Sequence, residues 1–320
     1  MPPERNKIDV SAIVPFFNSA EYLAESLESL LNQSIQTWEC ILVDDGSTDQ
    51  SSKIAREYCK NDARFRYIFQ ENRGPSAARN SGVDIAQGEY VQFLDSDDIL
   101  RKDRFELLLS EYKSTEKEVV LYSNMLIGDS ENIQCTRKPK RSSHIGHDVG
   151  YRDMYQKFLI DFIFIPSCLL IPKRIIEKIK WDPSLKHSED WDYYLNILSN
   201  DVKFRCVDIP LVIYRDTPKS LSKNLTISFE SKYNILVKWL KWKDYFHFLY
   251  RTNQLFTNNL FLLFIGRTNK IFWPWFQFKN TRLNIIPGLF ISLLLSVPIQ
   301  VGLIAYITTN KLLFNRPITL

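Results

Sequence analysis

Three carboxylates lie within four residues at 95–98, in the order Asp-Ser-Asp-Asp, directly after the apolar run 90–94. Like charges this close together repel one another unless a cation or a positive ligand group lies among them. Carboxylate oxygens at this spacing suit Mg²⁺ or Mn²⁺, whose remaining positions are commonly filled by water and substrate phosphates. The alternative is a solvated turn in which Asp97 or Asp98 caps a helix that begins near Leu100.

A second acid-rich turn lies at 44–47, in the order Asp-Asp-Gly-Ser, and also follows an apolar run. Around the two turns, short β-rich runs alternate with helical patterns. Strands are expected at 10–15, 38–43, 65–69 and 90–94, and helices at 21–32, 49–60 (capped by Ser47 or Thr48) and 74–87. This order predicts an α/β fold with a parallel sheet covered by helices and a site at the carboxyl ends of the strands. Both acid-rich turns fall at such ends, which favours a ligand site over two unrelated turns.

The pattern becomes less regular beyond the first hundred residues. A helix is expected at 102–116 and a strand at 118–122, whereas 123–150 holds a basic group at 137–141 and is expected to form a solvated loop. Further elements are expected as helices near 151–162 and 173–180, a helix that begins at 188–192, and strands near 202–207 and 211–215.

The chain of 320 residues can hold one large or two medium domains, and its charge is unevenly divided. Residues 1–231 carry 30 Lys and Arg against 36 Asp and Glu, whereas 232–320 carry 11 basic residues against one acid, Asp244. Such a basic segment suits an anionic membrane surface or nucleic acid. The five cysteines are widely spaced and contain no CxxC pair, which indicates reduced cytosolic thiols. The first residues hold no apolar stretch, so no signal peptide is expected.

The basic segment is also rich in aromatic residues. Between 232 and 282, fifteen aromatics are interleaved with nine Lys and Arg, and the following residues 283–310 carry no charge. A helix of that length would measure about 40 Å against a hydrocarbon core of about 30 Å, although Pro287 and Pro298 equally suit a kinked or re-entrant segment. Mixed aromatic and basic residues favour the headgroup zone of a bilayer. Membrane association is therefore favoured over a buried helical hairpin or binding of single-stranded nucleic acid.

Five stretches of the chain resemble, in order and spacing, the motifs of family 2 inverting glycosyltransferases, which have the GT-A fold. They are Val10–Asn18, Val43–Asp49, Glu71–Gly82, Gly88–Asp98 and His187–Asp192. The resemblance covers about residues 8–222 and leaves the basic segment outside. It implies a Rossmann-like GT-A domain with a mixed, mainly parallel sheet flanked by helices.

The resemblance also assigns roles to residues that would bind a nucleotide-diphosphate-sugar. Asp45 would hydrogen-bond the base, Pro15 would lie beside the base, and Asp95 would meet the ribose. Asp97, in a DXD motif, would hold the Mg²⁺ or Mn²⁺ that bridges both phosphates, and Arg79 would lie near the diphosphate. A metal and cations are needed there because the departing diphosphate is a polyanion. Without the resemblance, each residue is equally a cap, a turn acid or a surface arginine.

The remaining role is that of a general base, which the resemblance gives to Asp190. This residue lies at the start of a predicted helix, whose amino-terminal amides stabilise a carboxylate. The alternative is that Ser188–Asp190 serves only as a helix N-cap. One position departs from the family, because many members have a histidine where Thr217 stands. Arg215 or Lys219 would then supply the positive charge to the leaving group.

Together these features predict a membrane-associated, metal-dependent inverting glycosyltransferase of polysaccharide biosynthesis. The expected catalytic domain is 1–228, with a nucleotide-binding half at 1–122 and an acceptor half at 123–228, followed by a helical tail at 229–320. It would lie at the cytoplasmic face of the cell membrane and use a nucleotide-sugar, with a UDP-sugar expected as the commonest donor. The acceptor would be a hydroxyl on a glycan or lipid-linked glycan, and no nucleic acid is expected as a partner.

Two alternatives remain open from the sequence. The first is a polyprenyl-phosphate sugar synthase, whose phosphate acceptor needs no strong base, so that Asp190 weighs against it. The second is a non-catalytic, nucleotide-sugar-binding membrane scaffold, against which the intact acids weigh. A nicotinamide oxidoreductase is disfavoured because no GxGxxG follows the first strand.

Overall fold

The computed structural model describes residues 7–114, 119–129, 136–137, 149–150, 165–217 and six positions between 231 and 239. The chain forms two compact units, Met1–Lys232 and Tyr233–Leu320. The predicted helix at 151–162, Lys219 and almost all of the predicted tail, with its uncharged segment 283–310, lie outside the described residues. In the part that is described, no helix combines the length and apolar character needed to cross a bilayer. The membrane-associated tail therefore stays a prediction.

The amino-terminal part of the sheet consists of four parallel strands in the spatial order β3-β2-β1-β4. Their bounds are β1 Val10–Phe16, β2 Trp38–Asp44, β3 Phe65–Phe69 and β4 Tyr90–Phe93. β1 and β2 are buried along their whole length, as expected of strands covered on both faces. Because all four strands run in the same direction, the turns that follow β2 and β4 lie at the same edge of the sheet.

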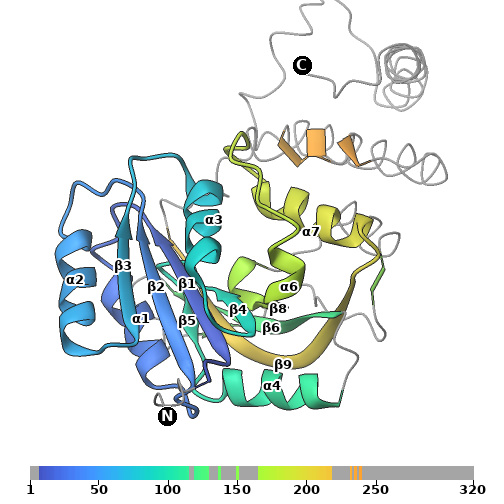
Figure 1. Ribbon diagram of the computed structural model, residues 1–320, viewed down its shortest axis with the longest axis horizontal. Helices are drawn as coiled ribbons and strands as arrows, with labels where there is room; N and C mark the ends of the chain where they lie inside the picture. Colours follow the sequence, from blue (N-terminus) through green and yellow to red (C-terminus); the bar gives the residue numbers. More distant parts are fainter. Residues whose placement is uncertain are drawn as a thin grey trace, which may run out of the picture. The chain divides into compact units, whose positions relative to one another are not determined.

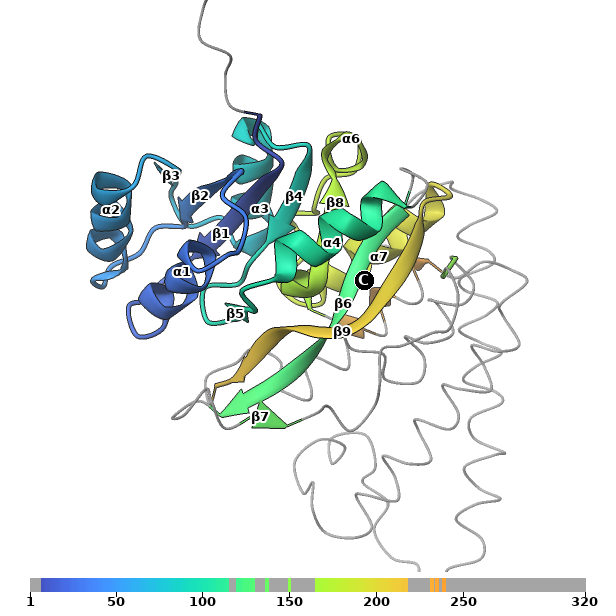
Figure 2. The same ribbon diagram turned by 90° about the horizontal axis from the view of Figure 1, so that it is seen from below.

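Helices cover both faces of this part of the sheet. α1 (Leu23–Leu31) and α2 (Ser51–Asn61) lie on one face and α3 (Pro75–Ile85) lies on the other (Figure 1, Figure 2). Right-handed crossovers require this arrangement. The chain moves across the sheet in one direction from β1 through β2 to β3, and it then turns back to place β4 on the other side of β1, so that α3 must cover the opposite face. α3 packs very closely, because a Cβ atom on Gly82 would lie 2.4 Å from Cγ2 of Ile13.

The carboxyl-terminal part of the sheet is mixed. β8 (Leu169–Pro172) runs antiparallel to β4 and to β6 (Val119–Asp129), and β6 runs parallel to β9 (Lys203–Asp216) in a long curved ribbon (Figure 2). Among the described residues, the sheet has the order β3-β2-β1-β4-β8-β6-β9-β5. The other elements are β5 Ile99–Leu100, β7 Thr136–Arg137, α4 Arg104–Lys113, the 3-10 helix η1 Pro166–Cys168, α6 Lys173–Ile176 and α7 Glu189–Ser199.

The structure confirms the predicted strands and helices up to residue 94, with ends that agree to within two residues. It corrects two predicted caps. Residues 99–100 form β5, and α4 begins only at Arg104 with Asp103 at its N-cap position, so neither Asp97 nor Asp98 caps a helix near Leu100. α2 has Gln50 at its N-cap position in place of Ser47 or Thr48.

Pairing in the sheet accounts for the other corrections. The strand expected at 118–122 continues to Asp129, since β9 pairs with it along its whole length, so 123–129 is not a loop. The two strands expected near 202–207 and 211–215 are one strand, β9, whose register against β6 shifts between Val207 and Pro210. Proline lacks the N–H that a regular ladder requires, so a bulge at this point lets the strand continue.

Candidate active site at the carboxyl edge of the sheet

Residues 95–98 form a tight turn after β4, which we call the acid turn. The backbone N–H of Asp98 donates to the carbonyl oxygen of Asp95 at 3.0 Å. The side chain of Asp98 is 1% exposed, and its two oxygens accept hydrogen bonds from the Ser167 hydroxyl at 2.6 Å and from the Arg215 backbone N–H at 3.2 Å. Asp95 and Asp97 keep more exposed surface. One of the three acids therefore holds the turn in the fold, and two remain for a ligand.

The carboxylate of Asp97 has the character of a cation ligand. Burial and the charge of Asp95 raise the pKa of Asp97 to about 6, while its own backbone N–H and the charge of Arg215 oppose this increase. A divalent ion would stabilise a carboxylate whose negative charge is only partly compensated by its neighbours, so Asp97 fits the predicted Mg²⁺ or Mn²⁺. Within the described residues, no group of three or more His, Cys, Asp or Glu side chains is arranged as a metal site. An ion at Asp97 would thus have few protein ligands, and Mg²⁺ is often bound by one or two carboxylates together with substrate phosphates.

Arg215, at the end of β9, places a buried positive charge beside the acid turn. Its side chain is 3% exposed, and Nε donates to the backbone oxygen of Asp97 at 3.0 Å. The guanidinium also pairs with Glu25 and lies 4.6 Å from the ring centroid of Tyr22. Of the two cations suggested by the sequence for the leaving group, Arg215 lies at the site and Lys219 lies outside the described residues.

Pro15 lies on β1, the neighbour of β4, and Asp45 directly follows β2, the next strand, at the same edge of the sheet. Pro15 is buried in β1, and the backbone N–H of Asp45, just after β2, donates to the carbonyl oxygen of Phe16 at 2.9 Å. The Asp45 carboxylate is 4% exposed. It accepts hydrogen bonds from Gln70 Nε2 at 2.6 Å and from two backbone N–H groups of the loop before α3, at Arg73 and Gly74. Asp45 therefore fixes the loop that leads into α3.

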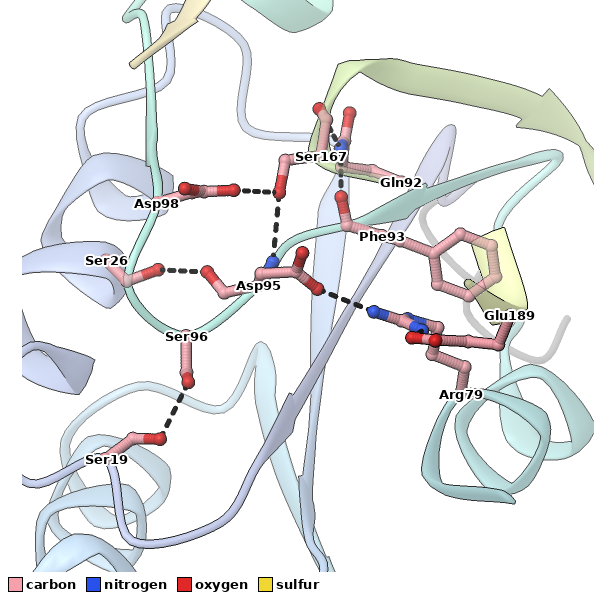
Figure 3. A network of polar contacts seen from close by, with 10 residues as sticks. All are labelled: Ser19, Ser26, Arg79, Gln92, Phe93, Asp95, Ser96, Asp98, Ser167 and Glu189. Atoms are coloured by element: carbon pink, nitrogen blue, oxygen red, sulfur yellow. Dashed lines mark hydrogen bonds and ion pairs between the residues drawn. The ribbon is translucent and has the colours of Figure 1, made fainter. Parts of the chain in front are cut away.

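Arg79 on α3 connects the acid turn to the beginning of α7. The side chain is 4% exposed, and its guanidinium donates to Asp95 Oδ1 at 2.9 Å and to Glu189 Oε1 at 3.2 Å (Figure 3). It also lies 4.4 Å from the ring centroid of Trp181. The neighbouring Asn80 exchanges two hydrogen bonds with the backbone of Trp181, at 2.9 and 3.0 Å. Two consecutive residues of α3 thus hold both the acid turn and the segment that precedes α7.

Asp190 is the second residue of α7 and follows Glu189, the partner of Arg79. Its Oδ1 accepts a hydrogen bond from the backbone N–H of Trp191 at 2.8 Å. Burial and the charge of Glu189 raise the pKa of Asp190 to about 7, while Trp191 N–H, Lys232 and Arg79 oppose this increase. A carboxylate with this pKa can accept a proton at neutral pH.

Residues 231 and 232 contact the region where α7 begins. Ser188 at the N-cap position has a left-handed backbone (φ 56°), and its side chain makes no capping hydrogen bond. The side chain of Ser188 therefore does not cap α7. The hydroxyl of Ser231 donates to the backbone oxygen of His187 at 2.7 Å, and Lys232 Nζ lies 4.9 Å from the ring centroid of Trp191.

Sequence reasoning missed Ser167, Glu189 as the partner of Arg79, and Lys232. Ser167 lies in the short helix η1, between stretches with no motif, so nothing in the sequence marked it. Glu189 belongs to the motif His187–Asp192, but only the fold brings it within 3.2 Å of Arg79, which is 110 residues away. Lys232 lies at the start of the basic segment, whose composition by itself indicates a charged surface.

Comparison with known proteins agrees with this arrangement. Residues 11–180 match the family described as "Glycosyl transferase family 2". The chain is similar to the uncharacterized glycosyltransferase EpsJ of Bacillus subtilis (strain 168), with 31% identity over 225 residues, 67% of this chain and 63% of EpsJ. It is also similar to the uncharacterized glycosyltransferase MJ1057 of Methanocaldococcus jannaschii, with 28% identity over 271 residues, 83% of this chain and 91% of MJ1057. The chain thus spans less than two thirds of EpsJ but most of MJ1057.

Solved structures show the same fold. TarS residues 1–349 from S. aureus, determined in complex with UDP-GlcNAc, align with a TM-score of 0.57 and 19% identity, over 77% of this chain and 80% of that chain. The same protein in complex with UDP aligns with a TM-score of 0.54. At this identity, the likeness establishes the arrangement of the elements.

Proposed function

Because the chain belongs to glycosyl transferase family 2, we propose that it transfers a sugar from a nucleotide-diphosphate-sugar to an acceptor hydroxyl with inversion at the anomeric carbon. The observation that carries this proposal is the double ion pair of Arg79. Through it, Asp95 of the acid turn and Glu189, next to the candidate base Asp190, are held by one buried guanidinium. Groups suited to the donor and a group suited to the acceptor thus belong to one connected site.

The proposed donor is a UDP-sugar. TarS, which shares the fold, was solved with UDP and with UDP-GlcNAc. Asp45 is proposed to accept a hydrogen bond from the base, with Pro15 beside it. Only one described hydrogen bond reaches its Oδ2, from Gly74 N–H at 2.8 Å, and a carboxylate oxygen can accept a second. Asp95 would accept from a ribose hydroxyl with the oxygen that Arg79 does not occupy.

Departure of the diphosphate requires positive charge. Asp97 is proposed to hold Mg²⁺ or Mn²⁺, which neutralises phosphate oxygens when bound. Arg215 has its charge fixed beside Asp97 by its contacts with the turn and with Glu25. Arg79 is proposed to lie near the diphosphate, where its ion pair with Asp95 holds its guanidinium in place.

Asp190 is proposed to remove the proton of the acceptor hydroxyl while that oxygen attacks the anomeric carbon. Its pKa of about 7 suits this role, because a base is most effective when its pKa lies near the working pH. A phosphate acceptor needs no such base, and this favours a hydroxyl acceptor over the polyprenyl phosphate of the alternative function.

We further propose that the acceptor is a glycan or lipid-linked glycan and that the basic tail holds the enzyme at the cytoplasmic face of the membrane, since the tail composition suits an anionic lipid surface.

The test is a panel of nucleotide-sugars incubated with the full-length protein and Mn²⁺ or Mg²⁺, with release of nucleoside diphosphate as the measurement. We expect one or a few UDP-sugars to be hydrolysed or transferred.

Asp190→Asn should lower transfer by about 10²- to 10⁴-fold, and donor affinity should stay nearly unchanged because Asp190 is not placed at the donor. Glu177→Gln is the matched control, because Glu177 lies just after α6 and its side chain pairs only with Lys173 among the described contacts. Absence of turnover with every donor, or substantial turnover by Asp190→Asn, would contradict the proposal.

A further inference from the structure

We propose that Ser167 is a positioning residue for donor binding, because its single hydroxyl group fixes both ends of the acid turn; this inference rests on the proposed function. Ser167 lies in η1, 69 residues after Asp98, and belongs to none of the motifs named above. Figure 3 shows it between Asp95, Asp98 and Gln92.

The direction of the hydrogen bonds is determined by the groups involved. The backbone N–H of Asp95 can only donate, and it reaches Ser167 Oγ at 3.1 Å. The hydroxyl proton of Ser167 is then directed to Asp98 Oδ2 at 2.6 Å. Asp97 lies between these two residues, so one oxygen atom contacts the chain on either side of the proposed metal ligand, in addition to the contacts of Arg215 with Asp97 and Asp98. A hydroxyl can fulfil both requirements at once because it is donor and acceptor.

Ser167 is itself held in place by a buried polar chain. Gln92 on β4 donates from Nε2 to the backbone oxygen of Ser167 at 2.9 Å and accepts at Oε1 from Arg104 Nε at 2.8 Å. Arg104 in turn donates to the Ser123 hydroxyl at 2.7 Å. Arg104, Gln92, Ser123 and Ser167 are all fully buried, at 0% exposure. A support of this kind does not relax easily, so the hydroxyl keeps its place.

Loss of the hydroxyl should therefore displace the acid turn. In Ser167→Ala, the Asp95 N–H and Asp98 Oδ2 would both lose their partner, and each can regain one only by turning toward water. Outer residues that orient a binding group typically change affinity or activity by about 10- to 100-fold when removed. The expected loss in Ser167→Ala is of that size for UDP affinity, with a larger effect on the KM for the donor than on kcat.

Ser11 provides a matched control at the opposite end of β1. It is also fully buried, its hydroxyl donates to Glu39 Oε1 at 2.7 Å, and it accepts from the backbone N–H of Gly88 at 2.8 Å. Its hydroxyl also accepts from the backbone N–H of Gln87 at 3.2 Å, so Ser11→Ala removes a similar set of hydrogen bonds, to a carboxylate and from backbone amides, away from the acid turn. A purely structural effect should appear in both variants.

The experiment compares full-length wild type, Ser167→Ala and Ser11→Ala by UDP titration calorimetry with Mn²⁺ and by hydrogen-deuterium exchange of the segment 93–99. Weaker UDP binding and faster exchange at 93–99 in Ser167→Ala alone would support the proposal. Equal UDP affinity and equal exchange in Ser167→Ala and wild type, or the same loss in Ser11→Ala, would overturn it. Where the alanine variant does not fold, Ser167→Cys keeps the volume with a weak donor and gives the same two readings. If wild type binds no UDP, the proposed donor is wrong, and the exchange at 93–99 alone decides whether Ser167 holds the turn.

Discussion

At the scale of single residues, the site depends on acids placed in different surroundings. Asp98 is buried and accepts two hydrogen bonds, whereas the carboxylate of Asp97 is left with little compensation. Asp190 lies apart from both, with a pKa of about 7 that reflects burial and its neighbour Glu189. Separate roles for chemically identical groups follow from these surroundings.

The pH dependence of transfer should report on Asp190. A base must be deprotonated to act, so kcat should rise with pH through an apparent pKa of about 7 and level off above it. The described charged groups that face Asp190 are Glu189, which raises its pKa, and Arg79 and Lys232, which lower it. Lys232→Met removes one lowering charge, and the rising limb should therefore move to higher pH. The measurement is the initial rate of donor consumption with acceptor between pH 5 and pH 9.

Lys173→Met is the control for this shift, because Lys173 pairs with Glu177 on α6 and does not influence Asp190 in the described structure. Its profile should coincide with that of wild type. If the rising part of the pH–rate profile of Lys232→Met coincides with that of wild type, or lies at lower pH, Lys232 does not lower the pKa of Asp190.

At the scale of elements, α3 determines how the two halves of the site meet. Arg79 and Asn80 lie on the side of α3 that reaches Glu189 and Trp181, and Gly82 allows the helix to pack against β1. A glycine within a helix is unfavourable by about 1 kcal/mol relative to alanine. Its presence here is explained by the space, since any side chain at this position would collide with Ile13.

We expect Gly82→Ala to destabilise the protein despite the higher helix propensity of alanine. The added Cβ would lie 2.4 Å from Cγ2 of Ile13 and 3.3 Å from Cγ2 of Val43, both on buried strands. Overpacking of a core typically costs about 1–3 kcal/mol, which exceeds the gain in propensity. The measurement is the free energy of unfolding in urea, and transfer should fall as well because Arg79 would move with the helix.

A surface position on the same helix provides the control. Asp84 is largely exposed and pairs with Lys180, so Asp84→Ala should change the free energy of unfolding by no more than about 1 kcal/mol. An unfolding free energy of Gly82→Ala at or above that of wild type would mean that α3 and β1 can separate without loss.

At the scale of the whole molecule, charge separates the two parts of the chain. The first 231 residues carry an excess of acids, whereas the remainder carries 11 basic residues and one acid. Ser231 contacts His187 and Lys232 contacts Trp191, and the first compact unit of the chain extends to Lys232. The catalytic domain expected at 1–228 stays a prediction, and these two contacts near the proposed base lie just beyond its end.

Deletion of residues 233–320 should abolish binding to anionic vesicles and leave hydrolysis of the donor intact. Each Lys or Arg near an anionic surface contributes about 1 kcal/mol, and this deletion removes ten of them. The measurement is co-sedimentation with phosphatidylserine-containing vesicles, and vesicles of neutral lipid serve as the control for the full-length chain. A truncated chain that still sediments would place the membrane contact elsewhere.

The sequence by itself determined the amino-terminal half of the fold, because β-rich runs and helical patterns alternate there and each turn carries local signals. It also placed the acids of 44–47 and 95–98 at strand ends, since parallel strands release their turns at one edge. The strands β5, β7 and β8 could not be predicted in this way. All three are short, and the pairing partners of β5 and β8 lie far away in the sequence, as with Leu170 beside both Gln92 and Leu121.

Only the tertiary structure decided how the acids are used. That Asp98 faces inward, that Arg79 binds Asp95 and Glu189 at once, and that Ser167 holds the acid turn are consequences of which side chains meet across the sheet. Local sequence determines where a strand or helix begins and ends. It does not determine which distant residue fills the space beside a given oxygen, and that contact decides whether a carboxylate supports the fold or remains for a ligand.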